Sequence, residues 1–175
     1  MSRRFRSLLR DRNGSAAAEL ALVTPFLLVL LFGALDLGNY FMSEHAVDKA
    51  VRDAARYAAR LPFTDYAGCD VAAGGAAEQQ TQRVARFGDP DGTGTARLPG
   101  WTDDSMTTVS IACDDGSGGH DWATAGIYTD FPSGETGPVV TVKATVPYNS
   151  LFNSFGLYAP QLNLNAQSQA AVIGA

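Results

Sequence analysis

The feature that most constrains this chain is an uncharged apolar run close to its N-terminus. Residues 20–35 read LALVTPFLLVLLFGAL and lie between two carboxylates, Glu19 and Asp36. These sixteen residues fall short of the roughly 20 that a membrane-spanning helix needs. Residues 15–18 are small and uncharged, so the segment reaches spanning length only if Glu19 lies inside it. The sequence therefore predicts one transmembrane helix that contains an ionisable side chain, which in a membrane is usually functional.

The charges are unevenly distributed along the chain. The first fourteen residues contain five arginines and one aspartate, whereas the whole chain has 13 basic and 18 acidic residues. Basic residues ahead of an apolar run predict a cytoplasmic N-terminus, with the remainder of the chain across the membrane. Because that remainder is acidic, it lacks the basic face that binding to phosphates requires, and we expect no nucleic acid partner.

A cleaved secretory signal is the main alternative for the apolar run. Such a signal ends in small residues with an A-x-A-like pattern, but the exit from this run reads GALDLGNY. Pro25 lies in the first third of the run, and we expect it to kink the helix without ending it, since membrane helices tolerate proline. The pattern favours an anchor that is retained.

The residues after Asp36 continue the helix with a different pattern. Segment 40–61 contains no glycine or proline until Pro62, which should end the helix. Asp48 and Arg52 share the outer face with Asp53 and Tyr57, and Asp48 and Arg52 form a favourable i,i+4 pair. Apolar residues recur at i, i+3 and i+4, and charged residues take the other face. The apolar face holds Val47, Ala50, Val51, Ala54, Ala58 and Leu61, and the outer face holds Glu44, Asp48, Lys49, Arg52, Asp53 and Arg56. One helix is predicted from about Ser15 to about Leu61.

The rest of the chain reads as a mixture of helix and strands. Residues 76–87 have the composition of a short helix closed by Gly88, and residues 88–104 are rich in turn-forming residues. Apolar residues alternate over 109–113, 140–146 and 162–166, which indicates strands. The predicted fold class is α+β, with a small antiparallel sheet against the outer half of the long helix. The strand order stays open.

Two cysteines, Cys69 and Cys113, both follow the apolar run. If that part of the chain faces an oxidising compartment, they favour a single disulfide. Two unrelated buried thiols are the alternative. Their spacing has no CxxC character, so metal binding or redox catalysis by these cysteines is not expected.

Two other polar clusters are candidate metal sites. Asp89, Asp91, Thr93 and Gly94 match the start of a calcium loop, but its twelfth position is Gly100, where a bidentate glutamate is required. We therefore predict a plain turn there. A second loop, residues 114–121, is glycine-rich and polar, which is typical of a loop that binds no metal. Metal binding stays open, because the loop contains four candidate ligands: Asp114, Asp115, His120 and Asp121.

Catalytic motifs are not found in the sequence. It contains no G-x-S-x-G, P-loop or H-E-x-x-H pattern, so we predict no enzyme, no cofactor and no small-molecule substrate. His45 lies on the polar helix face and is predicted to be a solvated surface residue. Arg52, Arg56 and Arg60 form an i, i+4, i+8 basic ridge. This basic ridge is either a solvated face or a contact surface for an acidic neighbour, such as a second copy.

The N-terminal features together resemble a type IV prepilin: a basic leader, Gly14, Ser15, Glu19 and an apolar helix that becomes amphipathic. The wording GSAAAELALVTPFLLVLLFGALDLG is similar to the TadE-like family, the minor pilins or pseudopilins of tight-adherence (Flp) pilus systems. The resemblance is strong from residue 13 to about residue 60. It departs from other pilins and from type II secretion pseudopilins, which usually carry Phe or Met after the glycine.

The resemblance implies an assembly protein with a type IV pilin-like fold. A prepilin peptidase would cut after Gly14, leaving residues 1–14 as a cytoplasmic leader, 15–38 as the transmembrane half of the helix and 39–175 as an extracytoplasmic α+β domain. The protein would be a single-pass protein of the bacterial inner membrane with a periplasmic C-terminal domain. Its partners would be the peptidase, other pilin and pseudopilin subunits and the inner-membrane assembly platform. Whether it enters the filament stays open.

The chemistry of Gly14 and Glu19 agrees with this interpretation. A cut after Gly14 creates an amine at Ser15, and the Glu19 carboxylate could neutralise that amine in its own subunit or a neighbour. Glycine would let an extended backbone enter a protease site and would interrupt the helix before the cut. The alternative function is an uncleaved, membrane-anchored periplasmic binding domain, for which the N-terminus is only an anchor.

Overall fold

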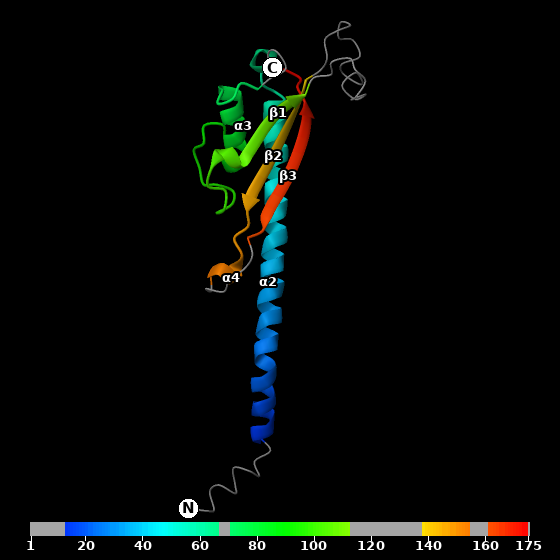
Figure 1. Cartoon of the computed structure of the whole chain (residues 1–175), viewed down its shortest axis with the longest axis vertical. Helices are drawn as coiled ribbons and strands as arrows, with labels where there is room; N and C mark the ends of the chain where they lie inside the picture. Colours follow the sequence, from blue (N-terminus) through cyan, green and yellow to red (C-terminus); the bar gives the residue numbers. More distant parts are fainter. Residues whose placement is uncertain (1–12, 67–70, 113–137, 155–160, 175) are drawn as a thin grey trace, which may run out of the picture. The chain divides into compact units, whose positions relative to one another are not determined.

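The computed structural model describes residues 13–66, 71–112, 138–154 and 161–174 (Figure 1). Its helices are α2 (Asn13–Ala58), α3 (Ala76–Phe87) and the short α4 (Leu151–Ser154), with 3-10 turns η1 (Phe63–Tyr66) and η2 (Asp104–Met106). Its strands are β1 (Thr107–Ala112), β2 (Val139–Pro147) and β3 (Asn163–Ala171). The chain divides into two compact units. The first unit comprises Met1–Asn39 and Ser150–Ala159, and the second unit comprises Tyr40–Asn149 and Pro160–Ala175.

Helix α2 runs through 46 residues and belongs to both units. Pro25 lies inside it, and the helix continues past this residue as predicted. The helix ends at Ala58, three residues before the predicted end at Leu61. There the backbone tightens, since Leu61 donates its N–H to the carbonyl of Ala58 at 3.1 Å, and Pro62 follows without an N–H to continue the ladder.

The second unit contains a three-stranded antiparallel sheet in the order β1-β2-β3. Val142 of β2 lies opposite Val109 of β1 on one side and Ser168 of β3 on the other. Val142, Ala144 and Val146 are buried, whereas Lys143 and Thr145 are exposed, so this part of the strand alternates as its sequence predicted. The first four residues of β2 are all buried, so the predicted alternation does not extend to Val140. The predicted α+β fold class with a long helix on an antiparallel sheet is confirmed.

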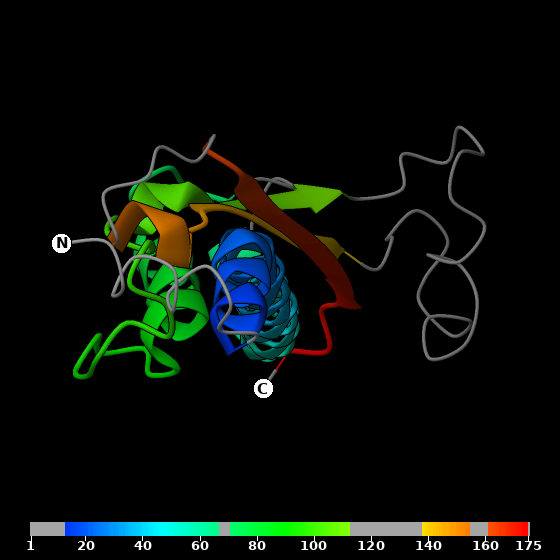
Figure 2. The ribbon, with the colours of Figure 1, turned by 90° about the horizontal axis from the view of Figure 1, so that it is seen from below.

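The core of the second unit lies between this sheet and the part of α2 that follows Asn39. Figure 2, which looks along α2, shows this part of α2 and α3 on the same face of the sheet. The helix contributes mostly small side chains, among which Ala50, Ala54 and Ala58 have no exposed surface. A row of alanines lets the helix backbone approach the sheet closely, and the valines of β2 fill the remaining space.

Helix α3 closes as the sequence predicted and fixes the following loop. Gly88 has a φ of 84°, a left-handed conformation that glycine adopts without strain, and its N–H donates to Val84 at 2.9 Å. The Arg86 guanidinium donates to the Trp101 carbonyl at 2.9 Å and to the Asp104 carboxylate at 3.0 Å. These contacts hold η2 and the start of β1 beside α3.

Candidate assembly site along the long helix

The N-terminal end of α2 contains the residues predicted to direct processing and assembly. Gly14 and Ser15 lie in the first turn, and Glu19 follows one turn later with an exposed side chain. The backbone is already helical at Asn13, so the predicted interruption of the helix at Gly14 is not present. Gly14 lies inside the helix because three alanines, residues 16–18, follow shortly after it. Alanine is a strong helix former, so the helix extends toward the N-terminus and includes Gly14. The cut after Gly14 and the role of Glu19 stay predictions.

The apolar side chains that follow Glu19 are exposed all around the helix. Leu22 and Phe26 each expose 72% of their surface and Leu30 exposes 69%, while Val29, on another side of the helix, exposes 67%. Burial of apolar surface stabilises by about 25 cal/mol per Å², so such exposure in water is unfavourable. Among the described residues, one helix, Ala16–Ala58, is long and apolar enough to cross a membrane. This helix indicates that the protein is anchored in a membrane.

Asp36, at the far end of the apolar run, contacts α4 within the first unit. Its Oδ1 accepts the N–H of Leu151 at 2.7 Å, and the Ser150 hydroxyl lies 3.1 Å from both carboxylate oxygens. The same hydroxyl accepts the N–H of Phe152 at 3.1 Å, so Ser150 is the N-cap of α4. A hydrogen bond to a charged group contributes about 1.5–3 kcal/mol. Sequence reasoning missed this contact; the signal for it was a serine directly before an apolar stretch.

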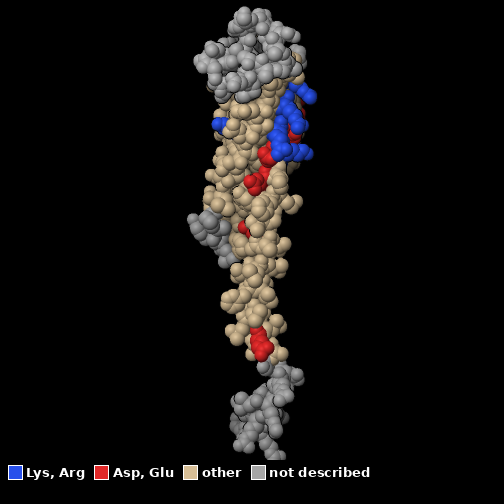
Figure 3. All heavy atoms as spheres, turned by 90° about the vertical axis from the view of Figure 1, so that its right-hand side faces the viewer, with Lys and Arg blue, Asp and Glu red and all other residues tan. Residues whose placement is uncertain are grey.

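The second-unit part of α2 presents the charged face that the sequence predicted. Arg52, Arg56 and Arg60 are all exposed, and Arg52 pairs with Asp48 one turn away. Figure 3 shows basic side chains gathered on one face of the molecule, with acidic side chains beside them. The basic ridge is therefore accessible, which fits both a solvated face and a contact surface.

Asp53 lies on that outer face, as predicted, but it is partly covered there. Its carboxylate pairs with Arg97 at 3.0 Å, and both side chains are only about a quarter to a third exposed, at 32% and 24%. Tyr57, one turn further on, donates its hydroxyl to Gln80 of α3 at 2.9 Å. The helix period placed both residues on the polar side. That side is partly covered because α3 and its following loop pack there, which a helix period alone does not reveal.

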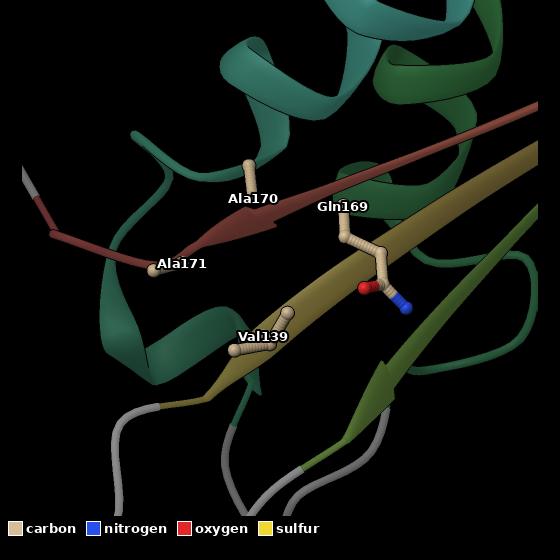
Figure 4. A pocket seen from close by; sticks show the side chains of 4 residues that line it. All are labelled: Val139, Gln169, Ala170 and Ala171. Carbon is tan, nitrogen blue, oxygen red and sulfur yellow. The ribbon is translucent and has the colours of Figure 1, made fainter. Parts of the chain in front are cut away.

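The described residues of the second unit line several surface hollows. A groove of about 450 Å³ lies between α2 and β3, lined by Phe41, Glu44, His45, Asp48, Asn165 and Ala166. His45 is exposed, as predicted. A hollow of about 320 Å³ lies at the ends of β2 and β3, where Figure 4 shows Ala170 and Gln169 projecting to opposite sides of β3. Gln169 already donates to Thr141 at 3.2 Å, so this hollow offers little to orient a polar ligand.

The calcium-like sequence forms a turn, as predicted. The Asp89 carboxylate accepts the hydroxyl and the N–H of Thr93, and the hydrogen bond from the Thr93 hydroxyl lowers the pKa of Asp89. Within the described ranges, no three His, Cys, Asp or Glu side chains gather in a way that could hold a metal. Cys69, Cys113 and the polar loop from Asp114 to Asp121 lie outside the described residues, so the disulfide stays a prediction.

Comparison with known proteins gives a family match for most of helix α2. Residues 14–56 match the family model described as TadE-like protein. A search of curated proteins and a search of solved structures each gave no match. The matched residues lie almost wholly within α2, so α3 and the sheet fall outside the match. The family indicates a function associated with tight-adherence (Flp) pili, which are built from several interacting components. The match confirms the resemblance inferred from the wording of the helix: residues 14–56 of this chain are a TadE-like segment.

Proposed function

We propose that the protein is a minor pilin or pseudopilin that acts in the assembly of a tight-adherence (Flp) type IV pilus. We further propose that a prepilin peptidase cuts it after Gly14. The observation that carries the proposal is the coincidence of three features at one end of α2. The TadE-like match begins at Gly14, a carboxylate follows at Glu19, and exposed apolar side chains follow that carboxylate.

The proposed topology follows from the charges and the helix. Residues 1–14 form a basic cytoplasmic leader, residues 15–38 cross the inner membrane, and residues 39–175 form the periplasmic domain. The partners are the peptidase, other pilin and pseudopilin subunits and the inner-membrane assembly platform. Five arginines precede the span, and positive charge before a span disfavours its transfer across the membrane.

Glu19 acquires its role once the leader is removed. The new amine at Ser15 and the carboxylate of Glu19 lie one helical turn apart, and either could pair within a subunit or between subunits. In apolar surroundings an unpaired charge is costly, so packing that pairs the two charges is favoured over other registers. A carboxylate close to the new N-terminus also interacts favourably with the helix dipole.

N-terminal sequencing of the membrane-extracted protein tests the cut. A chain that begins at Ser15 supports processing, and a Gly14→Leu variant should accumulate with its leader attached because a bulky side chain obstructs the scissile site. An intact arginine-rich tip in the wild type contradicts the proposal and supports a simple anchor. A start beyond residue 35 contradicts it as well, and supports secretion.

Substitution of Glu19 tests its role in assembly. Glu19→Ala should leave the protein in the membrane and cleaved, but should reduce the number of pili several-fold, measured by electron microscopy of cells. Glu19→Gln separates charge from size and should be similarly impaired. Glu44→Gln is the matched control, because Glu44 is an exposed glutamate on the same helix beyond the apolar run. Normal piliation by Glu19→Ala would sink the proposed role.

A further inference from the structure

The first unit contains a second element besides the apolar helix, the four-residue helix α4 (Figure 1). Its N-terminus is bound to the Asp36 carboxylate through the Leu151 N–H at 2.7 Å and the Ser150 hydroxyl at 3.1 Å. Ser150 is 5% exposed, whereas the hydrogen bond from the Leu151 N–H to Asp36 is open to the surface. Within the first unit, α4 is therefore held at one level along α2.

That level coincides with the end of a membrane span. The residues from Ala16 to Leu35 rise about 30 Å at 1.5 Å per residue, which equals the thickness of the hydrocarbon core of a bilayer. A helix that enters the membrane near Ala16 therefore leaves it at Asp36. In the proposed topology, Asp36 and α4, which it binds, then both lie at the periplasmic surface of the inner membrane.

The composition of α4 suits the boundary between lipid and water. Leu151 exposes 37% of its surface, and Leu35 and Leu37, on either side of Asp36 in α2, expose 53% and 55%. Exposed apolar side chains thus occur both at this end of the span and on α4. Polar groups accompany them, because Asn153 is exposed and the cap of α4 is hydrogen-bonded to Asp36. The membrane interface accommodates apolar and polar groups side by side.

We propose that α4 is a second membrane contact, with Leu151 inserted at the level of the outer lipid headgroups and Asp36 holding it there. The partner is the bilayer itself. The proposal rests on the membrane topology given under the proposed function, but on neither the cut after Gly14 nor pilus assembly. Its failure is therefore distinguishable from theirs.

Fluorescence quenching in vesicles tests the contact. Full-length Leu151→Trp protein is reconstituted at low density into phosphatidylethanolamine–phosphatidylglycerol vesicles containing lipids brominated near the headgroup or near the chain end. The wild type supplies the emission of its two native tryptophans, Trp101 and Trp122, for subtraction. The added emission should be mostly lost with bromines near the headgroup and less affected by bromines near the chain end.

Two further variants serve as controls for this measurement. Leu27→Trp, in the middle of the span, should be quenched most by bromines near the chain end. Asp91→Trp, in an exposed turn of the second unit, should be insensitive to both lipids. Equal emission of Leu151→Trp in brominated and ordinary vesicles overturns the proposal. Emission changes at residue 151 that arise only at high protein density also overturn it, because they assign this surface to a second copy.

The role of Asp36 is tested in the Leu151→Trp protein. Asp36→Ala removes the acceptor for the Leu151 N–H and should reduce the quenching at residue 151 at least twofold, whereas Asp36→Asn keeps an acceptor oxygen and should retain most of it. Quenching of Leu27→Trp should be the same with either substitution, which shows that the span is intact. Unchanged quenching at residue 151 in Asp36→Ala overturns the holding role of Asp36.

Discussion

The two parts of α2 differ in charge and in surroundings, because residues 20–35 carry no charged side chain whereas residues 40–61 carry a charged face. In the first unit the helix carries large side chains that are exposed, such as Leu22 and Phe26, each with 72% of its surface exposed. In the second unit, Val51 and Ala54 have no exposed surface. Large side chains occur where the described protein leaves the helix uncovered, and small ones occur where a sheet packs against it. Side-chain size and periodicity, together with hydropathy, distinguish a helix built for lipid from one built for a protein core.

The largest expected effect comes from making the same substitution in both parts of the helix. Ala54→Leu adds three carbons where the helix meets the sheet and should lower the free energy of unfolding by about 1–3 kcal/mol. Ala18→Leu, at an exposed position in the apolar part, should change it by less than about 0.5 kcal/mol. Urea unfolding of the full chain in detergent micelles, followed by tryptophan fluorescence, measures both. Equal effects would remove the distinction between the two parts.

The end of α2 provides a smaller effect. The Tyr66 hydroxyl donates to the carbonyl of Ala58 at 2.6 Å, and this tyrosine is 4% exposed. Tyr66→Phe should cost about 1 kcal/mol in the same unfolding assay, the usual contribution of one hydrogen bond. A cost near zero would mean that water replaces the hydroxyl and that this helix end is less enclosed than the core.

Tyr66 also gives the second unit a pH dependence. Burial, together with the nearby charge of Asp65, raises the pKa of Tyr66 from 10.0 to about 12. Because the folded protein holds this proton more tightly than the unfolded chain, the stabilisation is complete below pH 10 and is lost as the pH rises to about 12. Burial raises the pKa of Tyr57 in the same direction. Tyr66→Phe should therefore flatten, but not abolish, the alkaline loss of stability.

The smallest effects are expected from two ion pairs on the second-unit part of α2. Asp53–Arg97 joins the helix to a distant loop with side chains 32% and 24% exposed, and Asp48–Arg52 joins adjacent turns with side chains 38% and 58% exposed. Exposed helix pairs contribute about 0.3–0.5 kcal/mol. Double-mutant cycles should give the Asp53–Arg97 pair the larger coupling, near 1 kcal/mol. The reverse order would show that burial does not govern these pairs.

Local signals in the sequence were sufficient for most of the elements. The end of α3 at Gly88, the alternation in the later part of β2 and the turn at Asp89 each depend on residues a few positions apart. The contacts of Asp36, Asp53 and Tyr57 were not predicted because their partners are Ser150, Arg97 and Gln80, far away in the sequence. A helix period indicates which side a residue faces, but not what covers that side.

The sequence by itself determined the long helix, its division into an apolar part and an amphipathic part, and the TadE-like character of residues 14–56. These properties are written in composition and short spacings, because helix formation and apolar matching to a bilayer are local. Only the tertiary structure decided the order of the strands, the covering of Asp53 and the binding of α4 by Asp36. Each of these depends on groups distant in sequence whose pairing is selected by the packing of the whole fold.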